Sequence, residues 1–540
     1  MDRSDKRWVI DELEPHVAIR LKQLFTGIAR SQIVPFYFDD TPRMATDLDW
    51  FMSRYPLSIS TKDQGRLKRQ RRSHHQSIDK IEHFFSKDYV PPKIEFKQGL
   101  AARDYQSRGK QIILNKKRIF CGDELGIGKT VQAISCFTDP STLPALIVVQ
   151  THLPEQWRDE IERFTTLRVH LINGRQPYRL PESDIYIAKY SILSGWVDVF
   201  VRQNPIRMVV FDEMQELRRH QSQKYKAAKQ ITAETEYVLG LSHSPIYNYG
   251  EEIFNIMKLI NPDVLGDRTA FEREWCKYGK MVKDPKALGT YLREQHVFFR
   301  RTRADVGREL PPINQIVHTV PHDHQAVEQE QDLRRSLAMQ VLEGNFHESG
   351  QAAREFDMRL RQITGVGKAR AVAEYVKLLL DSGEPVLLSG WHREVYTIWL
   401  EELGKYYPAM YTGSESAVQK RESKRRFIEG ETNLMIISNR SGIGIDGLQK
   451  RCRYVVIGEL DWSPKVHEQL IGRVDRDGQP DQVTALYLVT DYGSDPHILD
   501  MLGLKQAQSH GIVDPLNAPK MKENDISRIK KMAQDYLNKI

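Results

Sequence analysis

The sequence predicts an α/β protein built of two parallel-sheet lobes, with a helical insertion between them and a small mixed N-terminal region. Three observations lead to this prediction. Short apolar runs alternate with amphipathic stretches from about residue 98, and the alternation resumes near residue 381. A polar, helix-forming stretch without strand patterns separates the two alternations. A glycine-rich turn that opens a helix, Cys121–Thr130, contains the end of the first apolar run.

Residues 1–97 are expected to form an ordered accessory region that ends in a basic linker. Aromatic and aliphatic residues recur before residue 60, and Gly65–Arg72 then places five basic residues in eight positions. Such a run can be a solvated helix face or linker, a contact with a DNA backbone or, in a eukaryote, a nuclear-import signal. The residues alone leave all three open.

The alternating stretches predict a first lobe over residues 98–320 and a second over residues 381–500. Residues 321–380 between them are expected to be a helical insertion or linker, and residues 501–540 a helical tail. Parallel strands are buried on both faces, so they appear as short continuous apolar runs. The candidate strands are Arg118–Cys121, Ala145–Val149, Ile185–Ala188, Met208–Phe211, Tyr237–Leu241, Val386–Gly390, Met435–Ser438, Tyr454–Ile457 and Ala485–Val489.

Composition narrows the class of protein. With 540 residues, 40% hydrophobic and 28% charged, the chain is expected to be globular and to exceed one core. It has no run of 18 apolar residues and opens onto no apolar signal core, so we expect no membrane partner and no secretion. Its four cysteines form no Cys-x-x-Cys pair, which argues against a zinc site and fits a reducing compartment. We expect the cytoplasm of a bacterial or phage-infected cell, or the nucleus if the source is eukaryotic.

The turn at Cys121–Thr130 has the features of a phosphate-binding loop. Gly126 and Gly128 allow the backbone N–H groups to point at an anion, and the following helix adds the positive end of its dipole. Lys129 would reach the β- and γ-phosphates, and the Thr130 hydroxyl would complete a Mg²⁺ shell. Asp123 stands where the strict pattern has its first glycine. Taken alone, the stretch could also be a turn before an ordinary helix.

A partner for this loop is expected at the end of another strand. The apolar run Met208–Phe211 ends in Asp212 and Glu213. Asp212 would hold the metal, and Glu213, one step further, would act as general base on the attacking water. An acidic loop after a buried strand is the alternative, but the phosphate loop upstream favours catalysis.

A third group lies in the second lobe. Arg473 and Arg476 are three residues apart and therefore share a helix face. An arginine delivered to a γ-phosphate stabilises the charge of the transition state. Because these arginines belong to the other lobe, they would reach the nucleotide only when the lobes close, which indicates a motor. By themselves they could equally be an exposed, salt-bridged pair.

As a set, the motifs resemble helicase superfamily two and, within it, the Swi/Snf-related DNA-translocating ATPases. The resemblance covers about residues 98–495, with the motifs in the family's order. An aspartate in place of the first loop glycine is normal in that family. A weaker resemblance links the chain to small bacterial, phage and mobile-element members and to the annealing-helicase branch. The stretches that carry the resemblance are Ala102–Gln106, Cys121–Thr130, Asp212–Gln215, Leu241–Asn248, Phe298–Pro312, Ser438–Asp446 and Gln469–Gln479.

The resemblance implies two RecA-like lobes, ATP and Mg²⁺ as cofactors, and double-stranded DNA as partner, with single-stranded DNA or RNA also allowed. It implies ATP hydrolysis coupled to tracking along the duplex or to remodelling of DNA–protein complexes. A protein partner in a larger complex is compatible with it. It places Gln106 on the adenine edge. The other nucleotide-binding residues that it implies are Asp123, Gly126, Gly128, Lys129, Thr130, Gly444, Asp446 and Gln469.

Three other functions share these motifs. A strand-separating or annealing helicase of DNA or RNA would carry the same set, as would the motor subunit of a restriction or phage-defence complex. A non-enzymatic nucleic-acid scaffold is disfavoured, because it has no need to keep the catalytic residues together.

The chain departs from the family at Met214 and Gln215, which replace an Ala-His pair.

Overall fold

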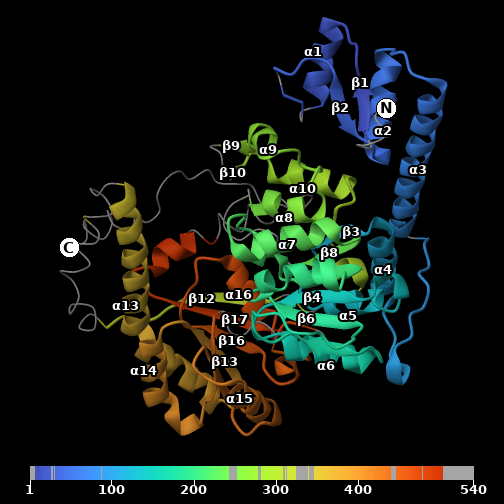
Figure 1. The fold of residues 1–540 in the computed structure, drawn as a ribbon. Coiled ribbons are helices and arrows are strands. Elements are labelled where there is room, and N and C mark those ends of the chain that lie inside the picture. The colour runs from blue at the N-terminus through green and yellow to red at the C-terminus, as the bar shows by residue number, and fades with distance from the viewer. Residues whose placement is uncertain are drawn as a thin grey trace. The chain divides into compact units, whose positions relative to one another are not determined.

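The structure is a computed structural model in which two parallel sheets form the centres of two compact units (Figure 1). The first unit comprises Met1–Gly122 and Gly128–Phe299, and the second comprises Asp123–Ile127 and Arg300–Ile540. Residues 346–354 are described by their backbone alone. The structure describes residues 7–25, 28–29, 31–86, 88–242, 252–277, 281–307, 311, 313–323, 339, 346–439, 445–476, 478–500 and 502.

The sheet of the first unit has seven parallel strands in the order β11-β3-β8-β7-β4-β6-β5. All residues of β4 and β8 are buried, as expected for strands that are covered on both faces. Because the strands are parallel, their carboxyl ends share one edge of the sheet, where the loop after β3 and the end of β7 both lie. The strands are β3 (Arg118–Cys121), β4 (Ala145–Val149), β5 (Val169–Leu171), β6 (Ile185–Lys189), β7 (Met208–Asp212), β8 (Tyr237–Leu241) and β11 (Phe298–Phe299).

Amphipathic helices accompany this sheet. In α6, for example, Trp157, Ile161 and Phe164 recur at helical spacing and are buried, while Pro154 begins the helix where no N–H donor is needed. A short hairpin, β9 (Cys276–Lys277) and β10 (Met281–Val282), follows α9. The helices are α4 (Asp104–Lys116), α5 (Lys129–Cys136), α6 (Pro154–Phe164), α7 (Gln223–Glu234), α8 (Glu252–Ile260), α9 (Arg268–Trp275) and α10 (Pro285–Glu294).

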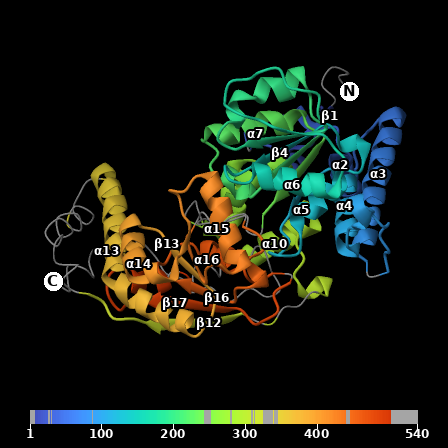
Figure 2. The ribbon, with the colours of Figure 1, turned by 90° about the horizontal axis from the view of Figure 1, so that it is seen from below.

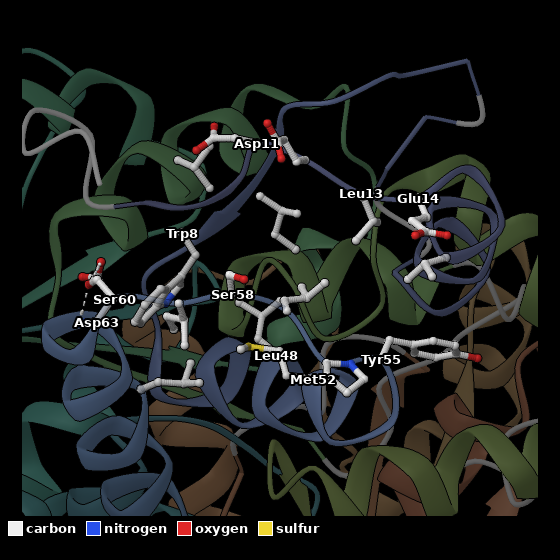
Figure 3. Close-up of a pocket in the computed structure, with 18 of the residues that line it drawn as sticks. Trp8, Asp11, Leu13, Glu14, Leu48, Met52, Tyr55, Ser58, Ser60 and Asp63 are labelled. Carbon is white, nitrogen blue, oxygen red and sulfur yellow. Dashed lines mark hydrogen bonds between the residues drawn. The ribbon is translucent and has the colours of Figure 1, made fainter.

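The N-terminal region has its own core. Antiparallel strands β1 (Arg7–Ile10) and β2 (Phe36–Asp39) pack with α1 (Pro15–Leu24) and α2 (Pro42–Arg54). An open pocket of about 1070 Å³ lies beside this core (Figure 3). The residues that line it include apolar Trp8, Leu48 and Met52 and acidic Asp11 and Glu14.

The basic run that we expected in a linker lies instead inside a long helix, α3 (Thr61–Phe85). Ser60 caps this helix by accepting a hydrogen bond from the Asp63 N–H over 3.1 Å. Its inward residues Leu67 and Ile81 are buried, and it packs on both α2 and α4 (Figure 1). The apolar residues at helical spacing therefore join the N-terminal region to the first sheet through a helix rather than through an irregular segment.

The second unit contains six parallel strands in the order β12-β17-β16-β13-β15-β14. Helix α13 (Phe346–Asp381) lies beside α14 (Arg393–Leu403), and both accompany this sheet (Figure 2). Helices α15 (Ala417–Glu429) and α16 (Pro464–Ile471) complete the unit. The strands are β12 (Asn314–Thr319), β13 (Val386–Gly390), β14 (Ala409–Tyr411), β15 (Leu434–Ser438), β16 (Tyr454–Ile457) and β17 (Thr484–Val489).

Two parts of the chain join the second sheet although the sequence analysis placed them elsewhere. Strand β12 lies within the stretch expected to end the first lobe, but it pairs with β17 through registers such as Ile316 with Leu486. The last turns of α13 lie within the expected insertion, but Val372 and Val376 pack into the core around β13. The second sheet therefore begins with β12, upstream of residue 320.

All nine predicted strands are present, with ends that agree to within one residue. The predicted two-sheet α/β fold is therefore confirmed. Within the described ranges, no helix combines the length and the apolar composition needed to cross a bilayer. The expected tail at 501–540 lies, apart from residue 502, outside the described residues.

Candidate active site

The phosphate loop connects β3 to α5, and its glycines have the backbone conformation that the sequence analysis expected. Gly126 and Gly128 have φ angles of +84° and +81°, in the left-handed region that favours glycine. A Cβ at Gly128 would lie 2.5 Å from the Gln106 Nε2, so a side chain there would also collide with a neighbour. Lys129 and Thr130 follow as the first two residues of α5, in the first turn of a helix, whose N–H groups and dipole favour an anion.

Gln106 lies beside this loop in the first unit. Its side chain is buried, with 5% of the residue exposed. The Gln106 Oε1 accepts a hydrogen bond from the Arg103 N–H over 3.0 Å, and Nε2 donates to the Gly128 carbonyl over 3.3 Å. Gln106 is thus held against the last glycine of the loop, and its contact with the adenine edge stays a prediction.

Asp212 ends β7, in the same unit as Lys129. Desolvation and the neighbouring Glu213 raise the pKa of Asp212 to about 6, whereas a hydrogen bond from Trp157 and the charge of Lys129 act in the opposite direction. The Trp157 Nε1 donates to the Asp212 Oδ2 over 2.8 Å, and the Tyr190 hydroxyl donates to the Asp212 carbonyl over 2.8 Å. The loop lysine and the strand-end carboxylate are therefore electrostatic neighbours.

Glu213 is held in an unusual backbone conformation. Its φ angle is +52°, which costs free energy for any residue other than glycine and is frequent at functional sites. The Gln215 Nε2 donates a hydrogen bond to the Glu213 Oε2, and Gln215 is itself buried. Gln215, which replaces the family's histidine, thus contacts the carboxylate that we expected to be the general base.

Asp123 receives a partner that the sequence analysis did not identify. Asp123 is buried, and its Oδ1 accepts hydrogen bonds from the Arg301 N–H over 2.9 Å and from the Arg301 Nε over 3.2 Å. The Arg301 Nη2 donates to the Asp123 Oδ2. The carboxylate in the first-glycine position therefore anchors the loop to the residues that follow β11. Its partner lies within Phe298–Pro312, the stretch of the family resemblance to which no role was assigned.

This ion pair leads to a stability prediction. Removing one partner of a buried pair leaves the other charge desolvated and costs about 3–5 kcal/mol. We expect Arg301→Gln to lower the unfolding free energy by about 3 kcal/mol and the double change Asp123→Asn/Arg301→Gln to cost less than the sum of the single changes. Urea unfolding of the four proteins in the full chain measures this coupling. Arg425→Gln, at an exposed arginine, is the control and should change the unfolding free energy much less than Arg301→Gln does. Strictly additive losses would contradict the pairing.

Arg303 extends this anchor within the second unit. Its backbone N–H donates to the Glu124 Oε2 over 2.8 Å, and its Nε donates to the Leu125 carbonyl over 3.1 Å. Its Nη1 and Nη2 reach the carboxylate and the carbonyl of Asp475, each over 2.6 Å. Asp475 stands between Arg473 and Arg476 in the sequence, so one side chain contacts both the phosphate loop and the arginine motif.

The remaining predicted residues are also in the second unit. The Arg476 Nη1 donates to the Asp446 Oδ1 over 2.9 Å, and its Nε donates to the Gly472 carbonyl over 2.9 Å. Gln469 is buried on α16, and Arg473 is buried in the turn that follows it. Because α16 ends at Ile471, Arg473 and Arg476 do not share a helix face, and that expectation was wrong. A Cβ at Gly126 would lie 3.3 Å from the Arg476 Cβ. Gly444 and most of the stretch Leu241–Asn248 lie outside the described residues.

The predicted site residues thus form two groups, each within one unit. The first contains the loop end, the glutamine and the two carboxylates; its members are Gln106, Gly128, Lys129, Thr130, Asp212 and Glu213. The second contains the loop start and the arginine motif; its members are Asp123, Gly126, Asp446, Gln469, Arg473 and Arg476. Sequence reasoning assigned no role to Trp157, Arg301, Arg303 or Asp475, because each acts through a contact with a distant part of the chain.

Two known protein families match this chain in sequence. Residues 48–365 match the SNF2-related domain, and residues 367–478 match the helicase conserved C-terminal domain. The DNA annealing helicase and endonuclease ZRANB3 of Bos taurus is 24% identical over 455 residues, which cover 77% of this chain and 41% of that protein. The uncharacterized ATP-dependent helicase YqhH of Bacillus subtilis (strain 168) is 24% identical over 432 residues, 72% of this chain and 75% of that protein.

A solved structure is also similar. The Sulfolobus solfataricus SWI2/SNF2 ATPase core in complex with dsDNA has a TM-score of 0.38 and 20% identity, covering 80% of this chain and 96% of that one. The chain spans only 41% of the length of the ZRANB3 relative. The SNF2-related match alone extends over more than half of the chain. The chain therefore belongs to the SNF2-related family of helicase-fold, ATP-dependent motors, as its motifs predicted.

Proposed function

We propose that this protein hydrolyses ATP and uses the free energy to translocate on double-stranded DNA. The observation that carries the proposal is the meeting of three features in one unit. The left-handed glycine of the loop, Lys129 at the start of α5 and the Asp212–Glu213 pair at the end of β7 lie at one edge of the first sheet. A phosphate cradle beside two carboxylates is the arrangement that phosphoryl transfer to water requires.

Each residue has a distinct task in this proposal. Lys129 and the N–H groups at the start of α5 bind the β- and γ-phosphates. Glu213, positioned by Gln215, accepts a proton from the attacking water. Arg473 and Arg476 stabilise the charge that develops on the γ-phosphate, and Asp446 orients Arg476.

The oxygen ligands at this edge fit Mg²⁺. Thr130 offers a hydroxyl and Asp212 a carboxylate, the donors that this hard cation prefers. Burial and, after it, the charge of Glu213 raise the pKa of Asp212, and a bound cation would favour the ionised carboxylate against both effects. Thr130 and Asp212 would hold Mg²⁺, which when bound supplies positive charge to the phosphate oxygens.

Double-stranded DNA is the proposed partner. The ZRANB3 relative is named a DNA annealing helicase. The motifs of this chain resemble those of the Swi/Snf-related DNA-translocating ATPases. The net charge of +7 is compatible with a polyanion. The proposal also includes a protein partner in a larger complex. It places the protein in the cytoplasm or, if the source is eukaryotic, in the nucleus.

The proposal predicts that duplex DNA stimulates ATP hydrolysis more than single-stranded DNA or RNA does. The measurement compares steady-state ATP turnover with each nucleic acid at equal nucleotide concentration and fixed salt. A triplex-displacement assay beside a strand-unwinding assay, on one preparation, then separates tracking from strand separation. We expect displacement of the third strand without unwinding. Equal or greater stimulation by single strands, or efficient unwinding, would instead favour the helicase alternative.

A further inference from the structure

Helix α3 carries more positive charge than any role assigned so far requires. Its 25 residues include seven lysines and arginines but three aspartates and glutamates. The acidic residues Asp63, Asp79 and Glu82 lie near the two ends of the helix. The middle of the helix is therefore strongly basic, and its arginines fall into two groups with different surroundings.

The first group ties the helix to the N-terminal region. The Arg66 guanidinium forms an ion pair with Asp40, which also accepts a hydrogen bond from the Gln70 Nε2 over 2.7 Å. Arg71 forms an ion pair with Asp49 of α2. These contacts neutralise two arginines and fix the orientation of α3.

The second group faces away from the packed side of the helix. Lys68, Arg69 and Arg72 are exposed, whereas the neighbouring Leu67 has only 2% of its surface exposed. Spacings of three and four residues place Lys68 and Arg69 next to Arg72 on one helix face. His75 continues this face by one further turn and is exposed as well. We call Lys68, Arg69, Arg72 and His75 the outer strip.

Acidic residues are missing from the helix positions next to the lysine and arginines of the outer strip. The residues three or four positions from Lys68, Arg69 and Arg72 are either uncharged or basic. The uncharged ones are Gln64, Gly65, Ser73 and Gln76, and the basic Arg71 is already paired with Asp49. Among the residues that the structure describes, no carboxylate forms an ion pair with Lys68, Arg69 or Arg72. Like charges at this spacing destabilise an isolated helix.

Two arginines of another basic helix, α15, have different surroundings. On α15, Arg425 contacts Glu422 over 2.7 Å and also pairs with Glu429 and Glu431. Arg426 lies 3.8 Å from Glu431. Two arginines of α15 thus have acidic partners close by, whereas within the described residues Lys68, Arg69 and Arg72 form no ion pair.

We propose that the outer strip of α3 binds the phosphate backbone of nucleic acid, as a contact additional to the ATP-dependent motor. This inference rests on the proposed function, because it deepens the DNA contact of that function. Arg69 and Arg72 are three residues apart, about 4.5 Å along the helix axis, and each DNA strand carries a phosphate about every 3.4 Å along its axis, so the two long side chains can meet neighbouring phosphates. The fixed orientation of α3 lowers the entropic cost of such a contact.

The test compares two double variants of the full chain. Arg69→Gln/Arg72→Gln removes two charges from the outer strip. Arg425→Gln/Arg426→Gln removes two charges from α15, where both arginines have acidic partners. Binding of a fluorescent DNA duplex is measured by anisotropy, without ATP, over a range of salt concentrations. Each phosphate contact contributes about 0.9 to the slope of log K against log salt, so we expect the outer-strip variant to lose about 1.8. Referred to 1 M salt, where the two proteins should bind alike, this slope gives about thirtyfold weaker binding near 0.15 M salt, with unchanged ATP turnover in the absence of DNA.

The outcomes distinguish the two proposals. An unchanged slope in the outer-strip variant, or an equal loss in the α15 variant, would overturn the contact even if duplex-stimulated ATP turnover is normal. Conversely, a lost slope in a protein without ATP turnover would retain the contact and reject the motor. Arms with single-stranded DNA and RNA show which backbone is bound. Binding of an import receptor with no loss of DNA slope would assign the strip to protein recognition and overturn the inference.

Discussion

Lys129→Ala will abolish ATP hydrolysis, with turnover falling by at least about 10²-fold. The change removes the cation that would neutralise the phosphates, and it acts on a second group as well. The charge of Lys129 lowers the pKa of Asp212, which desolvation and Glu213 hold at about 6. Without Lys129 that pKa rises further, so a larger fraction of Asp212 is protonated at neutral pH and metal binding weakens.

Steady-state turnover across a pH range, with varied Mg²⁺, measures both effects. We expect the residual activity of the variant to need more Mg²⁺ and to recover as the pH rises, because the raised pKa demands a higher pH for ionisation. Lys226→Ala, an exposed lysine on α7, is the matched control and should leave turnover unchanged. If the residual activity depended on Mg²⁺ and pH as the parent's activity does, the predicted effect of Lys129 on the ionisation of Asp212 would be contradicted.

Glu213→Gln will lower turnover by about 10²–10⁴-fold and leave ATP bound. The amide keeps the size of the side chain and a hydrogen-bonding group for Gln215, but it cannot accept the proton of the attacking water. Binding of a fluorescent ATP analogue and single-turnover hydrolysis separate binding from chemistry. Glu216→Gln makes the same change at a carboxylate that pairs with Lys224, and should retain turnover near the parent's. Turnover retained in Glu213→Gln would remove this residue from the role of base.

The central part of the fold was predictable from sequence because the strands there are buried on both faces. The nine predicted strands are the interior strands of the two sheets. The four that were missed, β5, β11, β12 and β14, are the edges. Strand β12 is exposed along its length, so it lacks the continuous apolar run on which the prediction depends.

The candidate site shows the same division. Glycines, lysine and strand-end carboxylates have local patterns, so their positions in the structure follow from the sequence. The partners of Asp123 and Asp475 could not be found in this way, since Arg301 and Arg303 meet them across more than 170 residues of chain. No local spacing records such pairings.

The buried Asp123 also bears on attempts to improve the protein by consensus. Glycine at this position would restore the strict phosphate-loop pattern and, by that measure, look like a repair. It would also remove the acceptor of three Arg301 donors and leave a guanidinium in a largely enclosed site. An average over phosphate loops in general is therefore the wrong reference for this loop, and alignment-guided stabilisation should leave residue 123 unchanged.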